Sequence, residues 1–111
     1  MEVGFDDESL RKLLASDKSL TRKFGERKAK LIKLRISQLQ AAANMTDLKF
    51  FPGRWHELTA NRAGLWAGDL VHPERIIIRP SQPAPIKDDG GVDWAAVTAI
   101  VVVEMVDYHK N

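Results

Sequence analysis

The sequence predicts an α+β domain in which two N-terminal helices pack on a mainly antiparallel sheet of four to five strands. Apolar residues recur at helical spacing through residues 10–43, and from residue 54 short strand-like runs alternate with turn residues. A Val-rich apolar run near the end of the chain predicts a central strand. With 111 residues, 44% of them hydrophobic, the chain supports one packed core, so residues 1–111 are expected to form a single domain.

The first part of the chain carries the signals for an edge strand and two helices. Residues 1–5 suit a short edge strand, and Asp6 or Asp7 can cap the helix that follows. A longer amphipathic helix is predicted over residues 20–43. Gly25 is a weak point near its start, because Gly in a helix interior costs about 1 kcal/mol relative to Ala.

The longer helix has an apolar side and a basic side. The apolar side is expected to pack on the sheet, which leaves the basic side outward, with Lys23, Arg27 and Lys30 in a row at helical spacing. The predicted apolar stripe comprises Leu20, Phe24, Leu31, Leu34 and Gln38, widened by Ile32, Ile36 and Leu39.

A meander of three antiparallel strands is predicted between residues 54 and 79. Residues 54–59 and 65–70 have strand composition, and the residues between them favour a turn. Pro73 cannot donate a ladder hydrogen bond, so the third strand is expected to begin after it, at residues 75–79. Beyond it, the Pro- and Gly-rich residues 81–91 predict an exposed loop, and residues 99–108 predict a central strand with both faces covered.

One face of this sheet is expected to carry cations, because successive side chains of a strand point to opposite faces. The side chains concerned are Arg54, His56, Arg62, Arg75 and Arg79. Their proximity predicts an anionic partner. The alternative is that Arg54 and Arg79 are solvated edge residues and that Arg75 pairs with Glu57 or Asp69.

Composition and charge favour some classes of function and exclude others. The net charge is only +2, but residues 11–35 contain ten Lys or Arg and two acids, which favours contact with nucleic acid or an acidic protein over the alternative of a solvated helix face. There is no Cys, hence no disulfide framework or thiolate chemistry. No run is long and apolar enough for a membrane span, and the acidic start differs from a signal peptide, so a cytoplasmic protein is expected.

The residue types support metal-independent cleavage of RNA. The three His, at positions 56, 72 and 109, lack metal-ligand spacing, and there is no phosphate-binding glycine loop or nucleophile elbow. RNA cleavage needs a base for the 2′-OH proton, cations for the developing phosphate charge and an acid for the leaving oxygen. The alternative is structural: His56 packed by hydrogen bonds, His72 in a turn, and Trp55 and Trp66 in the core.

Four features together resemble the HigB-type killer toxins of the RelE/ParE superfamily. They are RWHEL at residues 54–58, NRxGxW at 61–66, an arginine beginning the next strand at Arg75, and VDYH at 106–109. The resemblance implies a bacterial toxin–antitoxin module whose toxin enters the ribosomal A site, cleaves mRNA without a cofactor and thereby inhibits translation. It also implies inhibition by a cognate HigA-like helix-turn-helix antitoxin.

The resemblance also implies roles for single residues. Arg75 matches the phosphate-stabilising arginine, His109 an acid or base paired with Tyr108, and Arg62 the basic residue of the hairpin loop. His56 matches a histidine often present in its strand. Cations expected to hold RNA or the ribosome are Arg22, Lys23, Arg27, Lys30 and Arg54.

The sequence departs from the resemblance at Thr59, where such toxins commonly have a lysine. Threonine cannot clamp a phosphate as a cation does. Two alternatives to a nuclease stand beside it, and Thr59 supports the second of them. One is a ParE-like toxin that acts on DNA gyrase without catalytic residues, and the other is a catalytically inactive module that binds RNA or an antitoxin.

Overall fold

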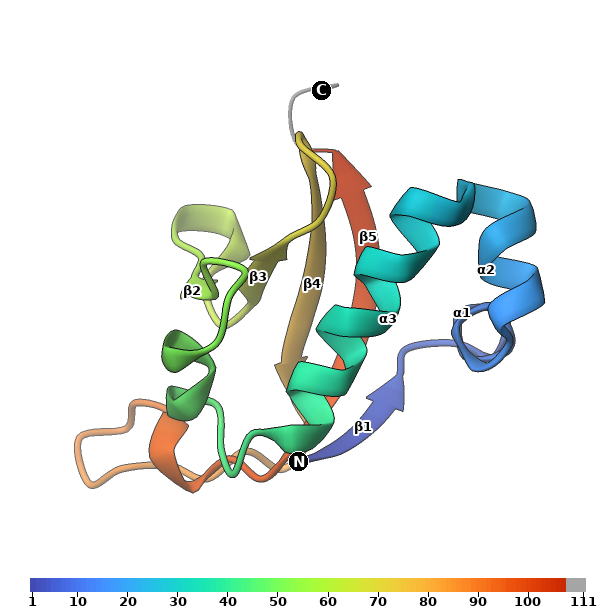
Figure 1. Ribbon diagram of the computed structural model, residues 1–111. Coiled ribbons are helices and arrows are strands. Elements are labelled where there is room, and N and C mark those ends of the chain that lie inside the picture. The colour runs from blue at the N-terminus through green and yellow to red at the C-terminus, as the bar shows by residue number, and fades with distance from the viewer. Residues whose placement is uncertain (108–111) are drawn as a thin grey trace.

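The computed structural model describes residues 1–107 and confirms the predicted α+β class (Figure 1). The helices and strands follow one another as β1 (Glu2–Phe5), α1 (Glu8–Ala15), α2 (Asp17–Phe24), α3 (Glu26–Ala41), β2 (His56–Glu57), β3 (Trp66–Asp69), β4 (Glu74–Pro80) and β5 (Ala99–Asp107). Short 3-10 helices lie between them at η1 (Thr46–Phe50), η2 (Ala60–Arg62) and η3 (Trp94–Ala96). No helix within residues 1–107 is long and apolar enough to cross a membrane.

The sheet has five strands in the order β1-β5-β4-β3-β2, and only the pairing of β1 with β5 is parallel. This confirms the mainly antiparallel sheet, the edge position of β1 and the meander of β2, β3 and β4. The first meander strand is shorter than predicted, because Arg54 has a φ of 51° and lies in the left-handed region. An extended strand therefore cannot begin at Arg54.

The prediction of one long helix over residues 20–43 was wrong, because the chain breaks at Gly25. Gly25 has a φ of 84° and a ψ of 164°, a conformation that the absence of a Cβ makes accessible, and its N–H bonds to the Thr21 carbonyl. Three helices therefore replace the predicted two. Asp7 is the N-cap of α1, as predicted, and its carboxylate accepts from the Leu10 N–H at 2.7 Å.

α3 is the helix that lies across the sheet, whereas α1 and α2 stand beside its first turns (Figure 1). Its buried side chains are Ala29, Ile32, Arg35, Gln38 and Leu39. The predicted apolar stripe was therefore partly wrong, since Leu34 is 49% exposed and Leu31 is only half-buried.

Hydrogen bonds explain why two polar residues of α3 are buried in place of these leucines. Gln38 Oε1 accepts from Trp55 Nε1 at 3.2 Å, and Arg35 Nε donates to the Asp69 carbonyl at 2.6 Å. A satisfied polar group can be buried at little cost, so these bonds set the rotation of α3 over the sheet.

The core lies between α3 and one face of the sheet. It includes Trp55, Trp66, Ile76, Ile78, Ile100 and Val102, and both tryptophans are buried as expected. Coverage of β5 is less complete than predicted: Ile100 and Val102 are buried, but Val101 and Val103 are only half-buried, because the helices cover one face alone. Residues 82–83 and 86–91 are exposed, in a loop closed by a bridge between Ile86 and Val92.

We expect Gly68→Ala to lower the free energy of unfolding by about 1–3 kcal/mol, because a Cβ there would lie 2.7 Å from Trp55 ring carbons. Urea unfolding followed by tryptophan fluorescence measures the change. Gly4→Ala is the matched control, since a Cβ in that strand meets atoms no closer than 3.7 Å. Equal stability of the two variants would contradict the close packing of Trp55 on β3.

Candidate functional site

The sheet face opposite α3 carries the cations that the strand pattern predicts. Ile76 and Ile78 belong to the core, so Arg75, Ile77 and Arg79 point to the other face. Register adds residues of the neighbouring strands to that face, because Asp69 pairs with Arg75, Ala67 with Ile77, and His56 with Ala67. The prediction that Arg75, Arg79 and His56 share a face is confirmed.

Asp69, the last residue of β3, is the point where three guanidinium groups meet. Its carboxylate lies 2.8 Å from Arg54 Nε and 3.1 Å from Arg75 Nε. Its carbonyl accepts from Arg35 Nε at 2.6 Å. The alternative that Arg75 pairs with Asp69 is therefore confirmed. The alternative that Arg54 is a solvated edge residue also agrees with the structure, since its side chain is 74% exposed even though it pairs with Asp69.

Arg75 is held in one orientation. Its side chain is 11% exposed. In addition to the ion pair with Asp69, Nη1 donates to the carbonyls of Pro73 at 3.3 Å and Glu74 at 3.2 Å. Nη2 makes no hydrogen bond to residues 1–107, so it can donate to a ligand without breaking a contact within that part of the chain.

The other arginines of this face also meet carboxylates. Arg62, on η2, lies 3.6 Å from Glu104 on β5, and Arg79 lies 3.3 Å from Asp6. Glu104 pairs with Ile77 in the sheet, so Arg62 reaches across the row in which Ala67 and Ile77 are fully buried. The face is therefore a network of alternating charges and not a cluster of uncompensated cations.

His56 is exposed on the edge strand β2. Its Nδ1 lies 2.7 Å from the Arg54 carbonyl, and because a carbonyl only accepts, Nδ1 carries a proton. In a neutral ring, Nε2 is then the acceptor and can take a proton from a ligand. β3 lies between the strands of His56 and Arg75, and the two positions are offset by two residues along the strand, which places their Cα atoms about 12 Å apart. A ligand would have to bridge them.

The predicted pair of Tyr108 and His109 lies outside the described residues. β5 is described as far as Asp107, and Val106 pairs with Arg75 while Asp107 pairs with Glu74. His72 is in the turn between β3 and β4, exposed and next to Pro73, as its sequence position predicts.

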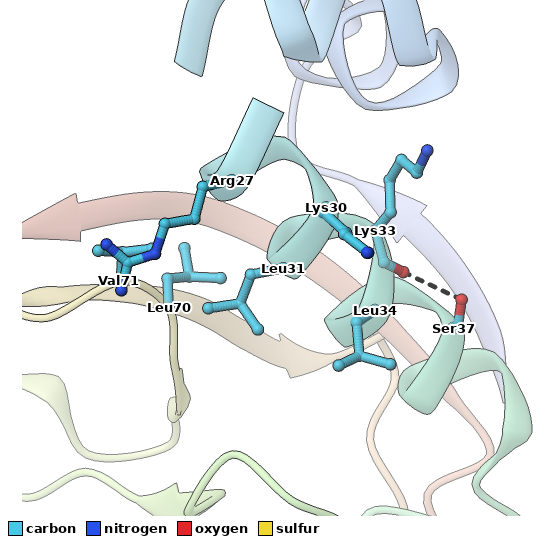
Figure 2. Close-up of a pocket in the computed structure, with 8 residues that line it drawn as sticks. All are labelled: Arg27, Lys30, Leu31, Lys33, Leu34, Ser37, Leu70 and Val71. Atoms are coloured by element: carbon cyan, nitrogen blue, oxygen red, sulfur yellow. Dashed lines mark hydrogen bonds between the residues drawn. The ribbon is translucent and has the colours of Figure 1, made fainter. Parts of the chain in front are cut away.

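The helix cations do not form the single row that was predicted. Arg22 and Lys23 are exposed on α2, whereas Arg27 and Lys30 are exposed on α3, and the break at Gly25 separates the two pairs. Lys23 lies near Leu10 and Leu13 of α1. Arg27 and Lys30 instead line a groove together with leucines (Figure 2).

Sequence reasoning missed the buried Arg35. Burial lowers its pKa, and the negative charge of Asp69 acts in the opposite direction. One signal was present, since Arg35 lies three residues after Ile32 and four before Leu39, on the face that those two residues bury. A charged residue at such a position needs a partner in the fold.

Comparison with known proteins gives no family. No family model matches the chain, and no curated protein matches it. Within residues 1–107, no group of three or more His, Cys, Asp or Glu side chains is arranged to hold a metal ion.

We expect Asp69→Asn to lower the free energy of unfolding by about 1–3 kcal/mol, because it leaves the nearly buried Arg75 without a counter-charge. Asp6→Asn is the control. It breaks the pair with Arg79, in which the side chains of Arg79 and Asp6 are 32% and 47% exposed, and should cost about 0.5 kcal/mol or less. Chemical denaturation at pH 7 compares the two variants, and a smaller effect at Asp69 than at Asp6 would contradict the central role of Asp69.

Proposed function

We propose that this chain is the toxin of a bacterial type II toxin–antitoxin module and acts as a ribosome-dependent, metal-independent mRNA endonuclease. The observation that carries the proposal is the placement of Arg75, Arg62 and His56 on the one sheet face that the helices leave uncovered. These are residues that the resemblance to HigB-type toxins assigns to the site. The resemblance further supports a HigA-like antitoxin as the partner that inhibits it.

The proposed reaction is attack of a ribose 2′-OH on the adjacent phosphorus. The 2′ oxygen forms a bond to phosphorus and its proton passes to a base, while the bond from phosphorus to the 5′ oxygen of the next nucleotide breaks. An acid protonates that 5′ oxygen as it leaves. The products are a 2′,3′-cyclic phosphate and a 5′-hydroxyl, and no oxidant or metal is consumed.

Arg75 is assigned to the charge that develops on the phosphate oxygens. Asp69 and two carbonyls hold its guanidinium, so it needs little reorganisation before it donates through Nη2. The resemblance assigns the acid or base to His109, next to Tyr108. His56 is the second candidate for the base, because its Nε2 is the acceptor in the neutral ring.

Binding of the ribosome is assigned to exposed cations of α2 and of the sheet edge. Arg22 and Lys23 lie in the last turn of α2, and Arg54 lies at the edge of the sheet face. Contacts of this kind attract the RNA backbone without reading its sequence, and they weaken as salt concentration rises.

A second candidate is a non-catalytic binding module, either a gyrase-directed toxin or an inactive RNA- or antitoxin-binding domain. The pairing of Arg54, Arg62, Arg75 and Arg79 with carboxylates favours it, because paired arginines attract a polyanion less strongly. Thr59 also favours it, since this exposed position offers no cation.

We expect Arg75→Gln and His109→Ala each to reduce mRNA cleavage at least about 100-fold, because each removes a group that acts in the transition state. Arg79→Gln is the matched control, since Arg79 shares the strand and the face of Arg75 but pairs with Asp6. Circular dichroism must show that all three variants fold. Full cleavage by Arg75→Gln would contradict the assignment.

Primer extension on mRNA in a translating extract tests the class of function directly. Cleavage should depend on ribosomes and should leave a 2′,3′-cyclic phosphate. Cleavage of free mRNA would overturn the ribosome requirement. Absence of cleavage together with gyrase-linked DNA breaks on expression would identify the gyrase-directed alternative.

A further inference from the structure

An open groove of about 640 Å³ runs along the outer side of α3, against the turn between β3 and β4 (Figure 2). Its apolar lining comes from Leu31 and Leu34 of α3 and from Leu70 and Val71 of the turn. Its polar lining comes from Arg27, Lys30, Lys33 and Ser37, all on α3. The groove is thus an apolar strip with cations beside it.

The apolar strip is open to solvent at its centre. Leu34 is 49% exposed, and Leu31 and Val71 are half-buried. The spacing of Leu31 and Leu34 places them on one ridge of the helix surface. The Ser37 hydroxyl does not need a hydrogen-bond acceptor from a ligand, since it already donates to the Lys33 carbonyl at 3.0 Å. An exposed ridge of this kind on a surface helix is the pattern of a helix-packing site.

Two of the groove cations have no counter-charge among residues 1–107. Arg27 and Lys30 form no ion pair with residues 1–107, whereas Lys33 lies 3.0 Å from Asp17 of α2. This differs from the open sheet face, where Arg54, Arg62, Arg75 and Arg79 each meet a carboxylate. A ligand for the groove should therefore bring both acidic groups and apolar surface.

RNA satisfies only half of that requirement. Its phosphates would pair with Arg27 and Lys30, but they would cover Leu34 and Val71 with charged surface and leave the apolar strip without a partner. An amphipathic helix with leucine-like residues at three- or four-residue spacing, flanked by Asp or Glu, satisfies both halves. Its ridge can pack beside that of Leu31 and Leu34.

We propose that this groove binds an acidic amphipathic helix of a partner protein. Arg27 and Lys30 pair with the acidic flanks of that helix, and Leu31, Leu34 and Val71 bury its apolar ridge. α3 covers the sheet face opposite to Arg75, so the partner and a ligand of the sheet face do not compete for the same surface. The proposal consequently holds whether or not the chain is a nuclease.

Site-specific photo-crosslinking in the producing cell tests the proposal. The photoreactive residue p-benzoylphenylalanine replaces Leu34 in the full chain, and the same residue at Phe50 is the control, because Phe50 is 84% exposed and lies outside the groove. The expected result is one dominant protein adduct at position 34 that is absent at position 50. Mass spectrometry of that adduct should place the linkage in an acidic segment with apolar residues at helical spacing.

Three results would overturn the proposal: a dominant adduct with RNA, an adduct with a second copy of this chain, or the same adducts at both positions. Calorimetry with a synthetic peptide of the crosslinked segment supplies the second measurement. Lys30→Glu and Leu34→Asp should each weaken its binding at least about tenfold. Lys18→Glu, an equal charge change on an exposed residue outside the groove, should leave binding unchanged, and an equal loss there would also overturn it.

Discussion

Asp69 connects the helix layer, the sheet and the sheet face opposite α3. Its carbonyl accepts from Arg35 of α3, and its carboxylate holds Arg54 and Arg75. The chain turns immediately after it, so the next two residues, Leu70 and Val71, form one side of the groove. Because buried or nearly buried guanidinium groups need counter-charges, this one residue fixes the position of α3 and the orientation of Arg75 together.

The sheet face opposite α3 and the groove on α3 differ in how their cations are neutralised. On the open face, carboxylates from separate parts of the chain, Asp6, Asp69 and Glu104, neutralise the arginines. Such a face cannot rely on a strong positive field, and any chemistry there depends on how rigidly donors are aimed at a ligand. In the groove, no carboxylate among residues 1–107 neutralises Arg27 or Lys30, and the apolar strip offers a surface that a polyanion cannot cover favourably.

A site of paired arginines is compatible with the proposed phosphate chemistry. Arginines that are close together repel one another until an anion arrives, and the carboxylates remove that repulsion in the unoccupied protein. Asp69 compensates the charge of Arg75 but leaves one of its nitrogens without a hydrogen bond to residues 1–107. A phosphate oxygen can then be recognised by direction as well as by charge, which is how a guanidinium differs from an ammonium group.

The sequence by itself determined the α+β class, the Asp7 cap and the β2-β3-β4 meander. It also determined the common face of His56, Arg75 and Arg79. Each of these features depends on the pattern of neighbours within a few residues. Tertiary structure alone decided the burial of Arg35 and Gln38 in place of Leu34 and the pairing of Arg79 with Asp6, 73 positions away. Those features depend on hydrogen bonds and charges contributed by distant segments, and a sequence pattern carries no information about which segments will meet.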